Sequence, residues 1–426
     1  MLSNPRDLAQ LREQPWFEEV VSAQHGINTL SSTQPADIHD YDLHQLSRWR
    51  QAGKPIDAHH LAQSEAVLSR ALAMQRARNA LPLTSWDGDL SPAISPSGRI
   101  GLSNREFFSP TRLQTWATCP FRYFLSNVLG IAAPEQPEEL ATISALERGS
   151  LLHAILERFI QEAQEQDAIP PPDQPWTDDH RRQLLKIAEE EFHKAEQRGV
   201  TGKPLLWEMV RDQMTSDLER FLKEDAKLRK KHGVSPHAVE SSFGFSGNED
   251  ESPLRSVEWS SARTGTLRFR GFIDRIDLSP SGDTALVLDY KSGGTSSYAN
   301  MNKDPLQRGK LLQLPVYGLA ARQLLGAGID IKVAYWFVTE KGKFVTRPPK
   351  PATLEEMLDA FSDVVGAITD GIGAGLFPAN PGRDGNNCRY CEFKHLCPTR
   401  REWHWRRKRN DPRLTAYVAM AGEEAS

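Results

Sequence analysis

Apolar residues recur at intervals of three and four along the first 80 residues and again in residues 145–166. Positions with this spacing lie on one face of an α-helix, so both stretches are predicted to be helical. In 145–166 the apolar face comprises Leu152, Ile155, Leu156, Phe159 and Ile160, with His153 at its edge. Residues 178–230 are highly charged and are predicted to be helical as well.

The pattern changes after a break marked by glycine and proline near residues 233–236. Residues 267–278 and 285–291 are predicted to be strands, and the connection 279–283 between them is typical of a tight turn. The remaining predicted elements are a strand at 239–245, a helix at 309–325, a strand at 332–339 and a helix at 354–372. This order predicts a mixed α/β domain in which helices flank a sheet.

The chain divides into four predicted parts. Residues 1–80 form a helical N-terminal region, and residues 81–108, which include a Pro-, Gly- and Ser-rich stretch, form a linker and lead-in. The main domain is expected to span residues 109–400, because Ser109-Pro110 is a favourable helix start. Residues 401–426 form a basic, tryptophan-containing segment and tail.

Composition limits the compartment and the chemistry. The 426 residues carry a formal net charge of −4, and no run approaches the roughly 18 apolar residues that a membrane span needs. The N-terminus lacks the positive-then-apolar pattern of a signal peptide, so we expect a cytoplasmic protein without a membrane partner. No G-x-x-x-x-G-K-[ST] sequence is present, which argues against ATP hydrolysis by this chain.

Four cysteines form a pattern that suggests a metal site. Cys119 stands alone, whereas Cys388, Cys391 and Cys397 make a C-x2-C-x5-C group far downstream. In a reducing compartment, clustered cysteines are expected to be metal ligands rather than disulfides. A four-thiolate site suits either Zn2+ or an iron–sulfur cluster, and the spacing leaves both open. Such a site would act as a clasp between the two ends of the main domain.

Acidic residues and a lysine mark the second candidate site. Asp289 and Lys291 are two apart in a predicted strand and therefore share a face, while Asp274 can face Asp289 across the hairpin. Converging carboxylates suit Mg2+ or Mn2+, and the lysine could orient a water or stabilise charge on a phosphate. The alternative is an ordinary surface Asp/Lys pair, because D-x-K is short and common. The apolar run 285–288 favours a buried strand end.

Further residues could complete this centre, each with a structural alternative. Glu240 could supply another carboxylate or be a solvated strand residue, and His153 could be a metal ligand or a packing histidine. Gln313 and Tyr317 share a helix face and could hold DNA or the lysine, or could pack at the core edge. The run 400–409 combines arginines with tryptophans and could contact nucleic acid or form a solvated face.

Taken together, these motifs resemble the PD-(D/E)xK nuclease superfamily, nearest to the C-terminal iron–sulfur nuclease domain of RecB- and AddB-type helicase–nucleases. The resemblance covers residues 80–400 and is carried by an ordered set of segments: Cys119-Pro120-Phe121-Arg122-Tyr123-Phe124, Arg148-Gly149-Ser150-Leu151-Leu152-His153, Gly271-Phe272-Ile273-Asp274-Arg275, Asp289-Tyr290-Lys291, Gln313-Leu314-Pro315-Val316-Tyr317 and the three late cysteines. It implies a restriction-endonuclease-like mixed sheet closed by the four-cysteine clasp.

The resemblance also implies roles for individual residues. His153, Asp274 and Asp289 would be metal ligands, Lys291 the catalytic lysine, and Gln313 and Tyr317 supporting residues; Glu240 matches the family less securely. Cys119, Cys388, Cys391 and Cys397 would hold a [4Fe–4S] cluster, with Zn2+ as the alternative. The ATPase-like part of such proteins is missing, so we expect either the tail of a longer protein or a free-standing relative.

The function expected from the resemblance is a Mg2+- or Mn2+-dependent deoxyribonuclease for DNA recombination and repair. It would act as an exonuclease on single-stranded or unwound DNA ends and could need a helicase or ATPase partner. The alternative is a non-catalytic iron–sulfur DNA-binding component of a helicase–nuclease complex.

Overall fold

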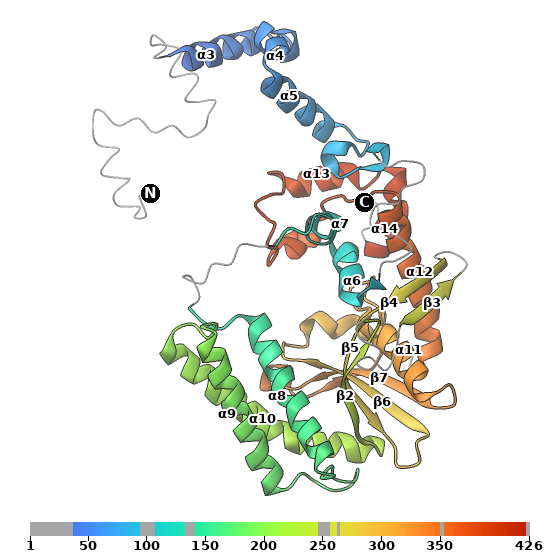
Figure 1. Ribbon diagram of the computed structural model, residues 1–426. Helices are drawn as coiled ribbons and strands as arrows, with labels where there is room; N and C mark the ends of the chain where they lie inside the picture. The colour runs from blue at the N-terminus through green and yellow to red at the C-terminus, as the bar shows by residue number, and fades with distance from the viewer. Residues whose placement is uncertain are drawn as a thin grey trace. The chain divides into compact units, whose positions relative to one another are not determined.

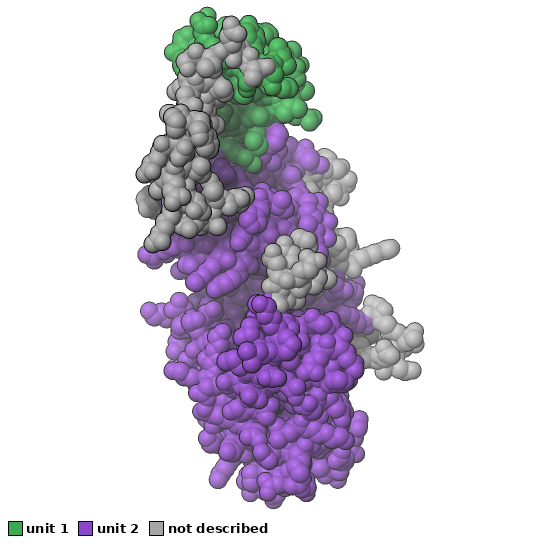
Figure 2. Space-filling view, turned by 90° about the vertical axis from the view of Figure 1, so that its left-hand side faces the viewer, with its two compact units in different colours: residues 1–80 green, residues 81–426 purple. Residues whose placement is uncertain are grey.

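The computed structural model describes residues 37–93, 107–132, 141–245, 256–261, 265–349 and 353–422. The chain separates into two compact units, residues 1–80 and residues 81–426, which are coloured separately in Figure 2.

The first unit is helical in its described part, as the N-terminal periodicity predicted. It contains α3 (Ile38–Gln51), α4 (His60–Ser64) and α5 (Ala66–Asn79). Asp37 caps α3 by accepting a hydrogen bond from the amide of Asp40, which satisfies one of the free N–H groups at the helix start. Neither α3 nor α5 buries a residue, so this unit adds little apolar core.

A five-stranded mixed sheet forms the centre of the second unit, with strand order β2-β5-β6-β7-β8. The pairs β2–β5, β5–β6 and β7–β8 are antiparallel, and β6 and β7 are parallel. The parallel pair is connected through α11 (Gln313–Leu325). The strands are β2 (Ser235–Phe243), β5 (Gly271–Leu278), β6 (Thr284–Lys291), β7 (Asp330–Phe337) and β8 (Thr346–Arg347). The predicted mixed α/β architecture is therefore confirmed.

The strand predicted over residues 267–278 is interrupted, and this prediction was wrong. Its first part, β4 (Gly265–Phe269), belongs to a second sheet with β1 (Phe107–Phe108) and β3 (Val257–Ser261). The amide of Arg270 donates to the Phe108 carbonyl, whereas Gly271 already pairs with Phe243 of β2. The backbone thus changes hydrogen-bonding partners at Arg270, which the sequence of residues 267–278 does not reveal.

Helices cover both faces of the central sheet (Figure 1). On one face, α8 (Ala145–Glu165), α9 (Asp178–Gln197) and α10 (Pro204–His232) enclose a core that includes Leu288 and Tyr290 of β6. On the other face, α6 (Pro110–Thr118), α11 and α12 (Leu354–Gly373) pack with residues such as Val287. Successive residues of β6 enter opposite cores because strand side chains alternate.

The stretch predicted to be helical over 178–230 is helical and contains two helices. α9 ends at Gln197 and α10 begins at Pro204. Between them, Gly199 and Gly202 have φ of 71° and 78°, a left-handed conformation that stops a helix. A β-carbon on Gly202 would lie 2.7 Å from the Ala141 carbonyl oxygen, so the turn also needs glycine for space.

The C-terminal elements pack against the beginning of the second unit. α14 (Thr415–Ala421) contacts α6 and α12, and Tyr417 packs edge-on against Trp116 of α6. A β-carbon on Gly371 of α12 would lie 2.2 Å from the Trp116 ring, so α12 must present glycine there. α13 (Arg401–Lys408) precedes α14 in the chain and buries Trp405. Among the described helices, none is both long and apolar enough to cross a lipid bilayer.

A fully buried network of charges joins α10 to β5. Arg275 pairs with Asp277 on its own strand and donates from Nη1 to Asp225 Oδ1 of α10, 2.7 Å away. Asp225 Oδ2 also accepts from Arg229 Nε and from the Trp176 indole, at 2.7 and 2.6 Å. Two arginines thus share one central carboxylate in a site without solvent, where breaking a pair costs more than the pair contributes.

We expect Asp225→Ala to lower the free energy of unfolding of the second unit by about 3–5 kcal/mol, because two buried guanidinium groups lose a shared carboxylate. Chemical denaturation measures the change. Asp212→Ala, an exposed acid on the same helix, is the matched control and should change stability by less than about 0.5 kcal/mol. Equal stability of the two variants would contradict the central role of Asp225.

Candidate metal centre

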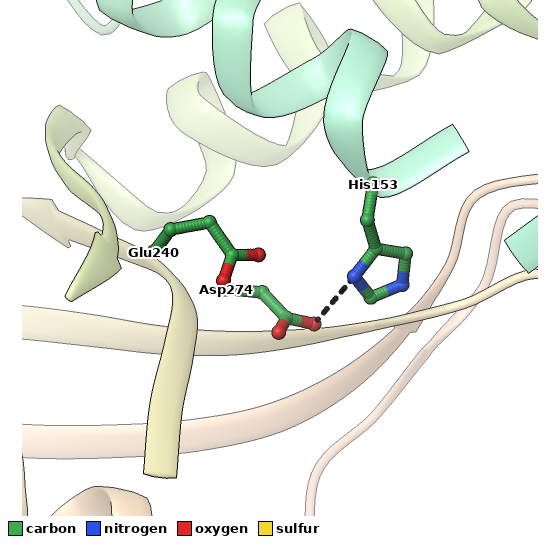
Figure 3. Close-up of side chains that lie close together, drawn as sticks. All are labelled: His153, Glu240 and Asp274. Carbon is green, nitrogen blue, oxygen red and sulfur yellow. Dashed lines mark ion pairs between the residues drawn. The ribbon is translucent and has the colours of Figure 1, made fainter. Parts of the chain in front are cut away.

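Three residues from separate elements converge at the edge of the β2–β5 pair. His153 of α8, Glu240 of β2 and Asp274 of β5 each present a ligand atom, and the three atoms all lie within 4.8 Å of one another (Figure 3). His153 Nδ1 is 3.6 Å from Asp274 Oδ2. Within the described ranges this is the one group of three His, Cys, Asp or Glu ligand atoms at such spacing. One nitrogen and two carboxylates suit Mn2+ or Mg2+.

Close packing of α8 brings His153 to this position. A β-carbon on Gly149 would lie 3.3 Å from the Ser292 hydroxyl, so this residue lets the helix approach the segment after β6. One turn later, the His153 ring meets the Tyr290 ring edge-on at 5.7 Å. Ser144 caps the helix by accepting from the Glu147 amide. Burial lowers the pKa of His153, which favours the neutral imidazole that a metal requires.

Glu240 has an unusual backbone conformation within β2. Val239 pairs with Arg275 and Ser241 with Ile273, so Glu240 falls opposite Asp274 in the register. Its φ of 42° lies in the left-handed region, which is unfavourable for a residue with a β-carbon and costs on the order of 1–3 kcal/mol. The unusual backbone turns the carboxylate toward Asp274 rather than along the strand face (Figure 3). Such strain is often found at functional sites.

The backbone of β6 holds the carboxylate of Asp274. The amide of Tyr290 donates to Asp274 Oδ2 at 2.6 Å. The pairing of Arg275 with Leu288 puts Asp274 opposite Asp289, as the hairpin argument predicted. The antiparallel register therefore brings the two acids together across the sheet.

Asp289 lies beside the group of three but is engaged by the lysine. It is 1% exposed, and its Oδ2 forms an ion pair with Lys291 Nζ. Lys291 Nζ also donates to Gln313 Oε1 of α11 at 3.1 Å. Of the four predicted metal ligands, the structure brings three within 4.8 Å and pairs the fourth, Asp289, with the lysine.

Burial, together with repulsion between carboxylates, determines the electrostatics of the site. Burial, followed by the charges of Asp289 and Glu240, raises the pKa of Asp274 well above its ordinary value. Burial, then Glu157 and Asp289, raises the pKa of Glu240 to about 7. Burial would lower the pKa of Lys291, but Asp289 and other neighbours raise it overall. A bound cation would relieve the repulsion, because it favours the charged form of each acid.

A second D-x-K sequence shows how the environment distinguishes the site. Asp330 and Lys332 on β7 are also two residues apart, and Lys332 Nζ lies 3.3 Å from Asp330 Oδ2. Their side chains, however, are 63% and 52% exposed. The side chains of Asp289 and Lys291 are 1% and 20% exposed. Charges in a poorly solvated site interact more strongly, so only the β6 pair can polarise a bound group effectively.

Three tyrosines lie near Asp289, and two of them, Tyr298 and Tyr335, were not predicted from the sequence. Burial and then the charge of Asp289 raise the pKa of Tyr317 and Tyr335, and burial raises that of Tyr298. Tyr317 was predicted, whereas Tyr335 faces Asp289 directly in the parallel β6–β7 register. Only knowledge of the strand pairing could have identified Tyr335. Tyr298 lies in a short 3-10 helix, Ser296–Asn302, which has no periodic signal.

All four cysteines line one cavity near α7 (Pro120–Tyr123). They are unpaired thiols, and Phe121 and Phe393 line the same cavity. Burial raises the pKa of Cys119 to about 11 and also raises those of Cys388 and Cys397. In the described part of the chain, the sulfur atoms form no set of three within 4.8 Å. The predicted closed four-sulfur clasp is therefore not shown, although its residues meet around one space.

Comparison with known proteins adds an independent finding. The sequence model of the PD-(D/E)XK nuclease superfamily matches residues 107–398. Curated relatives are named as subunits of an ATP-dependent helicase/deoxyribonuclease. The protein of Moorella thermoacetica is 27% identical over 266 residues, 60% of this chain and 22% of the relative. The protein of Symbiobacterium thermophilum is 27% identical over 320 residues, which cover 69% of this chain and 26% of the relative. The protein of Clostridium perfringens is 24% identical over 245 residues, which cover 56% of this chain and 20% of the relative. The chain thus spans about a quarter of these relatives' length.

The raised pKa of Glu240 predicts a stability change with pH. Between the ordinary pKa of a glutamate and about 7, the folded state keeps a proton that the unfolded state loses, so metal-free protein loses stability as pH rises. Glu240→Gln should therefore be more stable than the original protein by about 1–3 kcal/mol at pH 8 and equally stable at pH 4.

Thermal melting of metal-free protein at both pH values provides the measurement. Glu165→Gln, an exposed glutamate at the end of α8, is the matched control and should behave like the original protein at both. Added Mn2+ should raise the melting temperature of the original protein more than that of Glu240→Gln, because a ligand atom is lost. A pH-independent difference between Glu240→Gln and the original protein would contradict the raised pKa.

Proposed function

The chain belongs to the PD-(D/E)XK nuclease superfamily, and on this premise we propose that it is a metal-dependent deoxyribonuclease. The main support is that three ligand atoms lie within 4.8 Å of one another beside the buried Asp289–Lys291 pair. The proposed nuclease domain spans residues 109–400, with residues 81–108 as its lead-in and 401–426 as a basic tail.

His153, Glu240, Asp274 and Asp289 are the proposed ligands of Mg2+ or Mn2+. The donor set fits, because it combines neutral imidazole with buried carboxylates whose mutual repulsion a cation relieves. When bound, the ion would lower the pKa of a water and neutralise charge on a phosphate. Asp274 is oriented by the Tyr290 amide, which fixes the direction of its free oxygen.

Lys291 is the proposed catalytic lysine. Its ammonium group is positioned between the Asp289 carboxylate and the Gln313 amide oxygen, and neighbouring acids keep it protonated. A positive group so held can stabilise negative charge that develops on a phosphate and can orient an attacking water. Gln313 fixes the lysine, and Tyr317, on the same face of α11, closes the site toward the core.

DNA is the proposed substrate, because the relatives are named as helicase/deoxyribonuclease subunits. We propose exonuclease action on single-stranded or unwound DNA ends, in recombination or repair, with a helicase or ATPase partner. The alternative, a non-catalytic iron–sulfur DNA-binding component, is supported only by the cysteine cavity. The buried Lys291–Asp289 pair and the Gln313 hydrogen bond favour an enzyme.

A [4Fe–4S] cluster is the proposed occupant of the cysteine cavity. Tetrahedral zinc, with Zn–S bonds of about 2.3 Å, needs sulfur atoms about 3.8 Å apart. The four thiols share one cavity yet form no set of three within 4.8 Å in the described part of the chain, so a larger group fits their spacing better. The cluster would supply closure between α7 and the C-terminal segment, and its four thiols would have to lose their protons.

We expect Lys291→Ala and Asp289→Asn each to lower the rate of Mg2+-dependent DNA cleavage about 100-fold or more, because each removes a charge from a poorly solvated site. A gel assay with end-labelled single-stranded DNA measures the rate. Lys332→Ala and Asp330→Asn alter the exposed D-x-K pair on the adjacent strand and should leave the rate within about twofold. Cleavage by Lys291→Ala at the original rate would sink the proposed role of the lysine.

Replacement of Cys119 should abolish the metal content of the cysteine cavity. We expect Cys119→Ala to lose visible absorbance, iron and acid-labile sulfide, and to melt several degrees lower, because the long loop between Cys119 and Cys388 loses its closure. Ser126→Ala, which removes a small polar group from the same segment, should keep all three. If the original protein is colourless and contains stoichiometric zinc, the site holds zinc instead of a cluster. A Cys119→Ala variant with unchanged metal content and melting temperature would overturn both the cluster and the zinc assignment.

A further inference from the structure

A second cavity, larger than the cysteine cavity and rich in positive charge, lies among the C-terminal elements of the second unit. Its volume is about 720 Å3, and five basic residues line it: Arg308, Lys310, Arg383, Arg406 and Arg409. Only two of its lining residues are acidic, Asp384 and Glu402. The excess of cations within one concave space contrasts with the formal charge of −4 on the whole chain. We call this space the basic cavity.

Three segments that are remote in sequence supply the basic residues of the basic cavity. Residues 308–310 precede α11, residues 380–387 follow α12, and the remaining basic residues come from α13 and the residue after it. Lys310 Nζ lies 3.4 Å from Asn387 Oδ1, which links the first two segments. Asn380, Pro381 and Asn387 line both the basic cavity and the cysteine cavity, so the two spaces share a wall.

The segment that carries Arg308 is held in an unusual conformation. Gln307, Arg308 and Gly309 have φ of 43°, 59° and 81°, three successive residues in the left-handed region. Asp304 stabilises this turn, because its carboxylate accepts from the amides of Leu306 and Arg308 at 3.1 and 2.7 Å. A consecutive strained turn fixed by hydrogen bonds presents Arg308 in a defined position, and such strain is concentrated at ligand-binding sites.

The chemistry of the lining favours phosphate groups on a single strand. Guanidinium groups bind phosphate with two parallel hydrogen bonds, and lysine adds a point charge. A space of roughly 300–1,000 Å3 accommodates a ligand of drug-like size, such as one or two nucleotides, and is too small for a duplex. Trp405 forms part of the wall, and asparagine amides offer further donors.

Residues 308–310 of the basic cavity are close in sequence to Gln313, which contacts the catalytic lysine. Lys310 is three residues before Gln313, whose amide oxygen accepts from Lys291. Three residues span at most about 11 Å, so a strand bound at residues 308–310 is within a few nucleotides of the catalytic lysine. None of the metal-centre residues lines the basic cavity, which makes it a separate contact beyond the scissile bond.

We propose that the basic cavity binds the backbone phosphates of a single DNA strand and guides it toward the metal centre. This inference rests on the proposed nuclease function, since it takes DNA as the ligand. It assigns the positioning of the strand to Arg308, Lys310 and Arg406, which come from two of the three segments and are all exposed to solvent.

The test is the salt dependence of single-strand binding by a variant with three neutralised residues, Arg308→Gln, Lys310→Gln and Arg406→Gln. A fluorescent oligothymidine is used, and every protein carries Asp289→Asn so that the DNA stays intact. Each lost phosphate contact should reduce the slope of log K against log salt by about 0.7, hence by about 2 for three contacts. The same relation gives about 100-fold weaker binding at 0.1 M salt.

Two matched variants serve as controls. One removes the same number of positive charges outside the basic cavity, and the other changes side chains in the cavity but keeps their charge. Lys186→Gln, Lys223→Gln and Lys227→Gln remove three exposed positive charges from α9 and α10, outside the basic cavity, and should leave the slope within about 0.5 of the parent value. Arg308→Lys with Arg406→Lys conserves charge and should bind within about tenfold of the parent. Melting curves check that all variants are folded.

The outcomes distinguish this inference from the proposed function. If the parent binds the strand and the active protein cleaves it, but the neutralised variant keeps the parent affinity and slope, the basic cavity is not the strand site and the nuclease proposal stands. If the neutralised variant loses binding but protein with an intact Asp289 does not cleave DNA, the strand site stands and the nuclease proposal falls. Competition by millimolar nucleoside triphosphate that displaces the oligonucleotide completely would show a mononucleotide site and overturn the inference.

Discussion

The antiparallel pairing of β5 with β6 determines the arrangement of charges on both sides of the sheet. One register places Asp274 opposite Asp289 on the side of the metal centre and turns Arg275 and Tyr290 toward the helices α8–α10. A slip of one residue would exchange these faces and bury Asp289 against an apolar core. Arg275 resists such a slip, because its ion pair with Asp225 requires the face of β5 that is turned toward α10 in the observed register.

The metal centre and the buried network therefore depend on each other through the same strand. Asp274 and Arg275 are consecutive, one in a group of repelling carboxylates and the other in a paired set of buried charges. The first arrangement costs folding free energy, as the raised pKa of Asp274 and the strained backbone of Glu240 indicate. The second arrangement specifies where β5 lies against α10, so a costly site is held in place by a rigid neighbour.

The sequence predicted those parts of the site that local patterns encode. The strand period put Asp289 and Lys291 on one face, and the hairpin put Asp274 opposite them. It could not choose by motif alone between Asp289-x-Lys291 and the exposed Asp330-x-Lys332, because burial depends on which strands flank each one. Asp225 and Tyr335 were missed because their partners come from other elements. The break at Arg270 arises from a change of strand partner, which the residues of one strand do not encode. By contrast, the boundary between α9 and α10 is marked in the sequence by Gly199 and Gly202.

The cysteine cavity and the basic cavity share a wall, so the cysteines can affect the basic cavity as well as close the domain. Asn387 donates to the carbonyl of Thr118, the residue before Cys119, and its side-chain oxygen accepts a hydrogen bond from Lys310. Asn380 donates to the Tyr417 hydroxyl of α14 and accepts from the Gly382 amide. An occupant that binds Cys119 and Cys388, such as the proposed cluster, would therefore also restrain these two asparagines. In the proposed strand site, the positions of the basic side chains would then depend on the cysteines on the opposite side of the wall, although no cysteine lines the basic cavity.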